Sequence, residues 1–170
     1  MALKFEGPGN WPFAALPLLQ SAGIVLQPNF TKGRADSNLQ ILAVTALTSL
    51  SADDVRRLYN VPQSVTLEQH VVNMARHLLR FGCDGVIASP REIAAIRAEF
   101  PTKVLIVVPG IRMPGEPTDD HQRPGNPYDS VKAGADYLVV GRSIYNDPDP
   151  PGKVEDYVDK ITRGIDDREA

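Results

Sequence analysis

Short apolar runs alternate with segments of helical period along most of this chain, from Ile41 to Ile165. This alternation is the pattern of βα units that build a parallel sheet. The expected strands are four apolar runs, at residues 41–46, 85–88, 104–108 and 137–140. The run at 104–108 is apolar throughout, so we expect it to be covered on both faces, as strands of parallel sheets are. The sequence therefore predicts an α/β fold with four βα units.

Residues that commonly begin helices lie between the expected strands. Thr66 with Gln69 three residues later forms a capping box, in which each side chain satisfies a backbone N–H of the first turn. Ser89 followed by Pro90 is typical of an N-cap with proline at the first helical position. Apolar residues at helical spacing predict a last helix over roughly residues 154–165.

The first forty residues have a different character. Prolines at positions 8, 12, 17 and 28 interrupt any long helix there. Leu3–Phe5 and Ile24–Leu26 are each compatible with a short strand, which would raise the number of βα units to six. We therefore divide the chain into a divergent N-terminal segment, residues 1–40, and a βα region, residues 41–170.

Composition and charge exclude several classes of function. A chain of 170 residues is expected to form a single domain. Its net charge of −3, without a cluster of Lys and Arg, argues against nucleic-acid binding. The sequence has neither an apolar run of the roughly 20 residues that span a bilayer nor the pattern of a signal peptide, so we expect no membrane partner and a cytoplasmic location. Cys83 is the only cysteine, and we expect a packed thiol and no metal cluster.

The ends of the third and fourth expected strands carry the residues of a candidate phosphate site. Parallel barrels bind their ligands at the carboxyl ends of the strands. Gly110 and Gly141 lie at two successive ends, where main-chain N–H groups can approach an anion closely. Arg142 then supplies a guanidinium group that can bind phosphate oxygens with two parallel hydrogen bonds. The alternative is that both glycines only turn the chain and Arg142 pairs with a surface carboxylate.

Four stretches, in this order, resemble the ends of strands five to eight in orotidine 5′-phosphate decarboxylases: residues 44–49, 82–89, 109–112 and 134–144. The stretch 119–123, followed by Pro127, also resembles the loop after strand seven in that family. The resemblance implies the C-terminal half of a TIM (β/α)8-type barrel, that is, a partial barrel. Residues 1–40 would then hold remnants of strands three and four.

The resemblance also implies roles for single residues. Arg142 matches the arginine that binds the 5′-phosphate, with the backbone of Gly141 beside it. Ser49 matches a residue that hydrogen-bonds the pyrimidine, and Pro109 matches the position that lies against the base. The family has a glutamine that bridges phosphate and base, for which Gln122 is the candidate.

Counting back from Pro127 places His121 at the usual glutamine position instead, and a solvated loop histidine is the alternative for that residue. Lys4 is the candidate catalytic residue, because residues 2–7 resemble the strand-three motif that carries the family's lysine. Ala2 and Gly7 stand where that motif has its aspartates. An ordinary surface lysine is the alternative for Lys4.

These observations lead to three hypotheses. The first is an enzyme that converts orotidine 5′-monophosphate (OMP) to uridine 5′-monophosphate (UMP) without metal or organic cofactor, as the resemblance implies. The second is a catalytically inactive, phosphate-binding barrel fragment or truncated paralogue. The third is a phosphosugar enzyme of the same superfamily, which would need metal-binding carboxylates that we do not locate. Because an open sheet has unpaired edges, we also expect a homo-oligomer in which two copies cover them.

Overall fold

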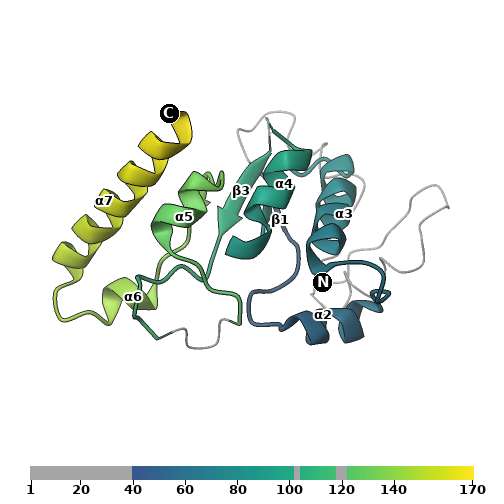
Figure 1. The fold of residues 1–170 in the computed structure, drawn as a ribbon, viewed down its shortest axis with the longest axis horizontal. Coiled ribbons are helices and arrows are strands. Elements are labelled where there is room, and N and C mark those ends of the chain that lie inside the picture. The colour runs from purple at the N-terminus through teal and green to yellow at the C-terminus, as the bar shows by residue number, and fades with distance from the viewer. Residues whose placement is uncertain (1–39, 102–103, 118–121) are drawn as a thin grey trace, which may run out of the picture.

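The computed structural model describes residues 40–101, 104–117 and 122–170 (Figure 1). Within these ranges four parallel strands form one sheet in chain order: β1 (Leu42–Val44), β2 (Gly85–Ile87), β3 (Leu105–Val108) and β4 (Tyr137–Leu138). Each strand pairs with the next, so that Val86 lies opposite Ile106 and Val107 opposite Tyr137. The four predicted strands are confirmed, each one shorter than its apolar run.

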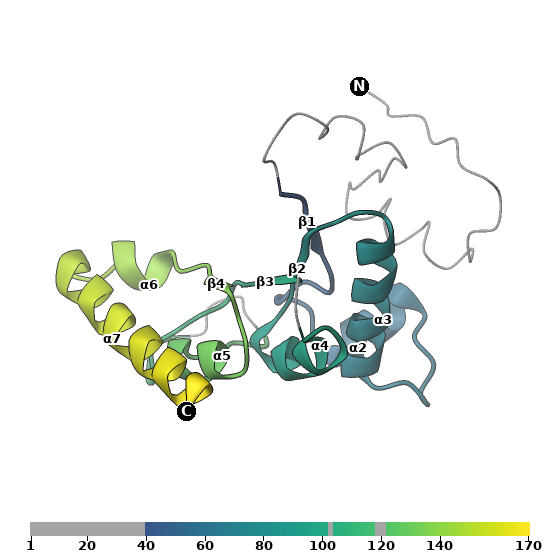
Figure 2. The same ribbon diagram turned by 90° about the horizontal axis from the view of Figure 1, so that it is seen from above.

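The helices of the described residues are α2 (Ala52–Tyr59), α3 (Leu67–Arg80), the short 3₁₀ helix η2 (Pro90–Glu92), α4 (Ile93–Glu99), α5 (Pro127–Lys132), α6 (Arg142–Tyr145) and α7 (Pro150–Glu169). Figure 2 shows α3, α4 and α5 on the same face of the sheet, with α7 packed beside α5. The capping box of Thr66 and Gln69 is present at the start of α3, and Ser89 caps η2 as predicted. The arrangement is that of successive βα units.

The last helix is longer than the prediction. It begins at Pro150 rather than near Val154, because two prolines occupy its first positions, where a helix tolerates a missing N–H. Asp149 caps this end by accepting a hydrogen bond from the backbone N–H of Gly152. The apolar spacing that guided the prediction begins only with Val154, so it did not extend to these first residues. The four-residue helix α6 was not predicted at all.

The core lies between the sheet and its helices. Val86, Ile106 and Val108 are fully buried and pack in one cluster with Ile93 and Ile96 of the α4 segment. Alternate residues of a strand point to opposite faces, so the neighbours of these residues face away from the helices. On β4 and just beyond it, this second face carries Tyr137 and Val139, whose side chains are 57% and 52% exposed. One face of the sheet is therefore covered by helices, as in the wall of a barrel.

Three further predictions concern the cysteine, membrane-spanning helices and the possible N-terminal strands. Cys83 is a buried thiol, as expected. No helix in the described ranges combines the length and the apolar character that crossing a bilayer requires. The possible strands Leu3–Phe5 and Ile24–Leu26 lie outside the described residues.

Candidate functional site

The carboxyl ends of β3 and β4 lie side by side because the two strands are paired in parallel. Gly110 follows β3 with a φ of 80°, a left-handed conformation that favours glycine. The chain then makes a long excursion and returns to the same place: the N–H of Gly125 donates to Gly110 O at 3.2 Å, and the N–H of Arg112 donates to Gly125 O at 2.9 Å. The loop after β3 is thus closed at its base by main-chain hydrogen bonds.

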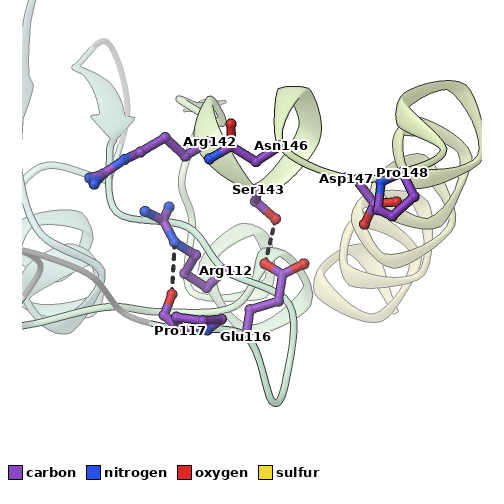
Figure 3. Close-up of a pocket in the computed structure, with 8 residues that line it drawn as sticks. All are labelled: Arg112, Glu116, Pro117, Arg142, Ser143, Asn146, Asp147 and Pro148. Atoms are coloured by element: carbon purple, nitrogen blue, oxygen red, sulfur yellow. Dashed lines mark hydrogen bonds between the residues drawn. The ribbon is translucent and has the colours of Figure 1, made fainter.

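A cavity of about 240 Å³ lies between this loop and α6. Figure 3 shows the residues that line it: Arg112, Glu116, Pro117, Arg142, Ser143, Asn146, Asp147 and Pro148. The side chain of Arg142 extends to the same side of the cavity as the guanidinium group of Arg112. The predicted arginine therefore lies in a concave site at the ends of β3 and β4, together with a second arginine.

Arg112 is held in place by main-chain carbonyl groups. Its side chain donates from Nε to Pro117 O at 3.2 Å and from Nη1 to Ile111 O at 2.9 Å, and the residue is only 7% exposed. These contacts fix the guanidinium group against the wall of the cavity. Gly110 and Gly141, the two glycines predicted beside the phosphate, precede Arg112 and Arg142 but do not line this cavity themselves.

Glu116 brings a negative charge to the same cavity, and that charge is balanced locally. Its carboxylate accepts hydrogen bonds from Ser143 Oγ and from the N–H of Met113, and lies 2.5 Å from Lys153 Nζ. Burial raises the pKa of Glu116, but the hydrogen bonds from Lys153, Ser143 and Met113 lower it more, so the net pKa lies below the ordinary value. The carboxylate is therefore ionised near neutral pH and paired with a cation.

The residues expected on the base side form a separate group. The N–H of Gln122 donates to Thr48 O at 3.0 Å, which places Gln122 next to the turn that carries Ser49. Both Gln122 and Ser49 are exposed, and Pro109 is half-buried. None of these three lines the cavity with the two arginines. The structure thus brings Gln122 close to the turn that carries Ser49, at a second place along the strand ends.

Two predicted residues, Lys4 and His121, lie outside the described residues. Other residues of the site were not predicted. Arg112 belongs to the stretch 109–112 that resembles the family, but no role was predicted for it. Glu116 lies in a loop whose path cannot be predicted from the sequence. In the ranges that the structure describes, no group of three or more His, Cys, Asp and Glu side chains is arranged to hold a metal ion.

The chain matches known proteins in family, sequence and fold. The family model described as "Orotidine 5'-phosphate decarboxylase / HUMPS family" matches residues 22–157. The chain is 42% identical over 118 residues to the orotidine 5'-phosphate decarboxylase of Nitrobacter winogradskyi, covering 69% of this chain and 48% of that protein. It is 40% identical over 149 residues to the enzyme of that name from Pelobacter propionicus, covering 88% of this chain and 59% of the relative.

Among solved structures, the orotidine 5'-phosphate decarboxylase of Lactobacillus acidophilus matches with a TM-score of 0.58 at 31% identity. That match covers 74% of this chain and 50% of the solved chain. The predicted α/β fold, part of a TIM barrel, is confirmed by this match and by the parallel sheet. This chain spans about half the length of the curated relatives it matches, between 48% and 59% of the two named above.

Proposed function

Since the chain belongs to the orotidine 5'-phosphate decarboxylase / HUMPS family, we propose that it binds a nucleoside 5′-monophosphate and contributes to the conversion of OMP to UMP. Arg142 is the residue that binds the 5′-phosphate in this proposal, with the backbone of Gly141 and Gly110 beside it. A nucleotide of this kind has a dianionic phosphate, which a planar guanidinium group can bind with two parallel hydrogen bonds.

One observation carries the proposal: two arginines, Arg112 and Arg142, line a single cavity at the carboxyl ends of β3 and β4. Two positive charges in one concave site attract a doubly charged anion more strongly than a singly charged one. Glu116 adds little repulsion, because Lys153 balances its charge at 2.5 Å. The position also agrees with the place where parallel barrels bind phosphate.

The base of the nucleotide is assigned to the second group of residues. Ser49 would hydrogen-bond the pyrimidine, and Pro109 would lie against its ring. Gln122, held beside the Ser49 turn by its hydrogen bond to Thr48 O, would bridge towards the phosphate. His121 is the alternative bridging residue, from its position relative to Pro127.

The test is a calorimetric titration of the protein with UMP. Replacing Arg142 by Ala should weaken binding by roughly 10- to 100-fold, because hydrogen bonds to a charged group are worth about 1.5–3 kcal/mol. Arg163→Ala is the matched control, since Arg163 is an exposed arginine on α7 whose side chain is 63% accessible. Equal affinities for the parent protein and the Arg142 variant would refute the phosphate assignment.

A second candidate is a catalytically inactive binding module. The observation that favours it is that Ala2 and Gly7 stand where the strand-three motif of the family has its aspartates. Incubation with OMP separates the two candidates. UMP formation that disappears in Lys4→Ala supports an enzyme with Lys4 as its general acid, whereas UMP binding without any turnover of OMP supports the module.

The proposal includes a homodimer. Within the described residues β1 and β4 are the outer strands of the sheet, and a groove of about 510 Å³ lies between β4 and α7. Val154 and Val158 of α7 border this groove and are 42% and 55% exposed. A second copy that packs there would bury this apolar surface.

Light scattering at micromolar concentration tests the dimer. Val158→Lys should give a monomer, because a charge cannot be buried at low cost in an apolar interface. Asp159→Lys, at the next and also exposed position of α7, should leave the mass unchanged. A monomeric mass for the parent protein, with a cooperative melt, would rule the dimer out.

We also place the protein in the cytoplasm, which agrees with its single buried thiol, Cys83.

A further inference from the structure

Arg123 is a buried arginine in the loop after β3 that the proposed function leaves unused. The residue is 2% exposed, and its guanidinium group reaches the end of β1, 76 and 77 residues earlier in the chain. Nη2 donates to Ala46 O at 3.0 Å and to Leu47 O at 2.8 Å. Nη1 lies 2.5 Å from the carboxylate of Glu92, which follows β2 in η2. One side chain therefore connects the segments that follow three neighbouring strands, β1, β2 and β3.

The main chain on either side of Arg123 is also attached. On one side, the N–H of Gln122 donates to Thr48 O at 3.0 Å, next to the carbonyl groups that Arg123 binds. On the other side, Gly125 is hydrogen-bonded to Gly110 and Arg112. Arg123 thus lies between the base-side group and the cavity with the arginines. The side chain of Arg123 is buried, whereas its neighbour Gln122 is exposed beside the Ser49 turn.

The ion pair of Arg123 and Glu92 is poorly suited to add stability. Glu92 is 1% exposed, and two charged groups removed from water lose much of their hydration. Among the described residues, Glu92 Oε2 and Arg123 Nε are buried and have no hydrogen-bond partner. A pair of well-packed apolar side chains often stabilises a protein as much as such an ion pair does. What an apolar pair cannot supply is the directed hydrogen bonds to Ala46 and Leu47.

We propose that Arg123 is a positioning residue that fixes Gln122 against the Thr48–Ser49 turn, and so sets the base side of the nucleotide site. This inference rests on the proposed function. The guanidinium group has the required geometry because its planar fork donates in several fixed directions at once. A lysine at this position has a single nitrogen and cannot reach both the β1 carbonyl groups and Glu92 in the same geometry.

The test compares two probes, UMP and ribose 5-phosphate, which share the phosphate and differ in the base. Arg123→Lys should weaken UMP binding by roughly tenfold and ribose 5-phosphate binding by a clearly smaller factor, since Gln122 bridges towards the phosphate but only UMP also loses its base contacts. Gln122→Ala should have the same selectivity. Because Arg123 acts through Gln122, the variant that combines Arg123→Lys with Gln122→Ala should bind UMP no more weakly than Gln122→Ala alone.

A purely structural role is separated from a positioning role by Glu92→Leu combined with Arg123→Met. This variant removes the ion pair and fills its space with apolar groups. Its melting temperature should equal or exceed that of the parent protein, while its UMP affinity should stay as low as that of Arg123→Lys. The same variant serves as the test if Arg123→Lys fails to fold.

The outcomes are distinct. If the parent protein binds UMP and the apolar pair restores both stability and UMP affinity, Arg123 is structural only and the inference is wrong. The same conclusion follows if Arg123→Lys weakens both probes equally. If the parent protein binds neither probe, the proposed function itself fails, and the role of Arg123 fails with it. Selective loss of UMP at full stability supports the inference.

Discussion

Ser143 donates its hydroxyl hydrogen to the carboxylate of Glu116 and joins the first turn of α6 to the loop after β3. The hydroxyl group of Tyr157 donates to Ser143 Oγ in turn, at 2.7 Å, and Lys153 pairs with Glu116 from the same helix, α7. Three elements, the loop, α6 and α7, are thus connected through one carboxylate at the wall of the cavity. The charge state of Glu116 should therefore matter for stability as well as for the site.

We expect Glu116 to stabilise the fold in a pH-dependent way. The pKa of Glu116 is lower in the folded protein than its ordinary value of 4.5, so the unfolded chain takes up the proton first as the pH falls. The stabilisation is complete above about pH 4.5 and is lost as the pH falls through the folded-state pKa. Urea unfolding between pH 3 and 6 should show a shallower acid decline in Glu116→Gln. Glu155→Gln, an exposed change on α7, should keep the parent profile.

His70 should produce a second pH dependence, at a higher pH. Burial lowers the pKa of His70 below its ordinary value of 6.5, and its Nε2 atom has no hydrogen-bond partner among the described residues. The folded protein disfavours the protonated ring, so the unfolded chain binds more protons below about pH 6.5. Stability is therefore complete above that pH and declines as the pH falls through the folded-state pKa.

The measurement for His70 is the melting temperature between pH 5 and 8. His70→Gln should flatten the decline below pH 6.5, whereas His77→Gln, at an exposed position of the same helix, should leave it in place. One proton of difference between the folded and unfolded states sets an upper limit of about 1.4 kcal/mol per pH unit. An unchanged slope in the His70 variant would contradict the assignment.

Arg97 and Arg76 allow a comparison of two ion pairs with different surroundings. Arg97 donates to Gly134 O through Nε at 3.1 Å and Nη2 at 2.7 Å, to Val104 O at 3.1 Å and to Asp136 at 2.7 Å. Arg97→Ala should lower the free energy of unfolding by about 2–4 kcal/mol, because these carbonyl groups lose a charged donor. Arg76→Ala should cost less than about 1 kcal/mol, since its pair with Glu99 is on the surface. Urea titration of both variants measures the difference.

The fold could be predicted where the signal is local. The capping box of Thr66 and Gln69 needs only four consecutive residues to form, so its pattern is visible in the sequence. The strands could be predicted because an apolar run such as 104–108 fits few other structures. The helix α6 could not, because four residues give too few turns for a helical period. The extent of β4 was overestimated because the apolar run 137–140 continues past Leu138, where the strand ends.

The site could be predicted only in part. Arg142 comes shortly after the last expected strand, residues 137–140, so its place at a carboxyl end is a consequence of the βα pattern. The pairing of Ser143 with Glu116 joins residues 27 positions apart through a loop of irregular course. Arg123 lies in a polar stretch that is typical of an exposed loop, yet it is 2% exposed. Its burial depends on Glu92 and on the end of β1, contacts that no local pattern contains.

Gly125 should be the position of the loop after β3 that tolerates a side chain least. A Cβ atom at this position would lie 2.3 Å from Cβ and 2.7 Å from Cγ of Pro90, a rigid ring at the start of η2. Gly125 also holds both main-chain hydrogen bonds that close the loop, to Gly110 and from Arg112. The loop and η2 must therefore move apart if a methyl group is added.

Gly125→Ala should lower the free energy of unfolding by about 1–3 kcal/mol, the usual cost of overpacking. Gly115→Ala provides the control within the same loop: no atom of the described residues lies within 4 Å of its added Cβ, so its left-handed φ of 88° sets the penalty, about 1–2 kcal/mol. The two variants should differ in UMP affinity more than in stability, because only Gly125 determines where Arg112 and the return of the loop lie. If both variants bind UMP with equal affinity, the closure of the loop at Gly125 does not shape the site.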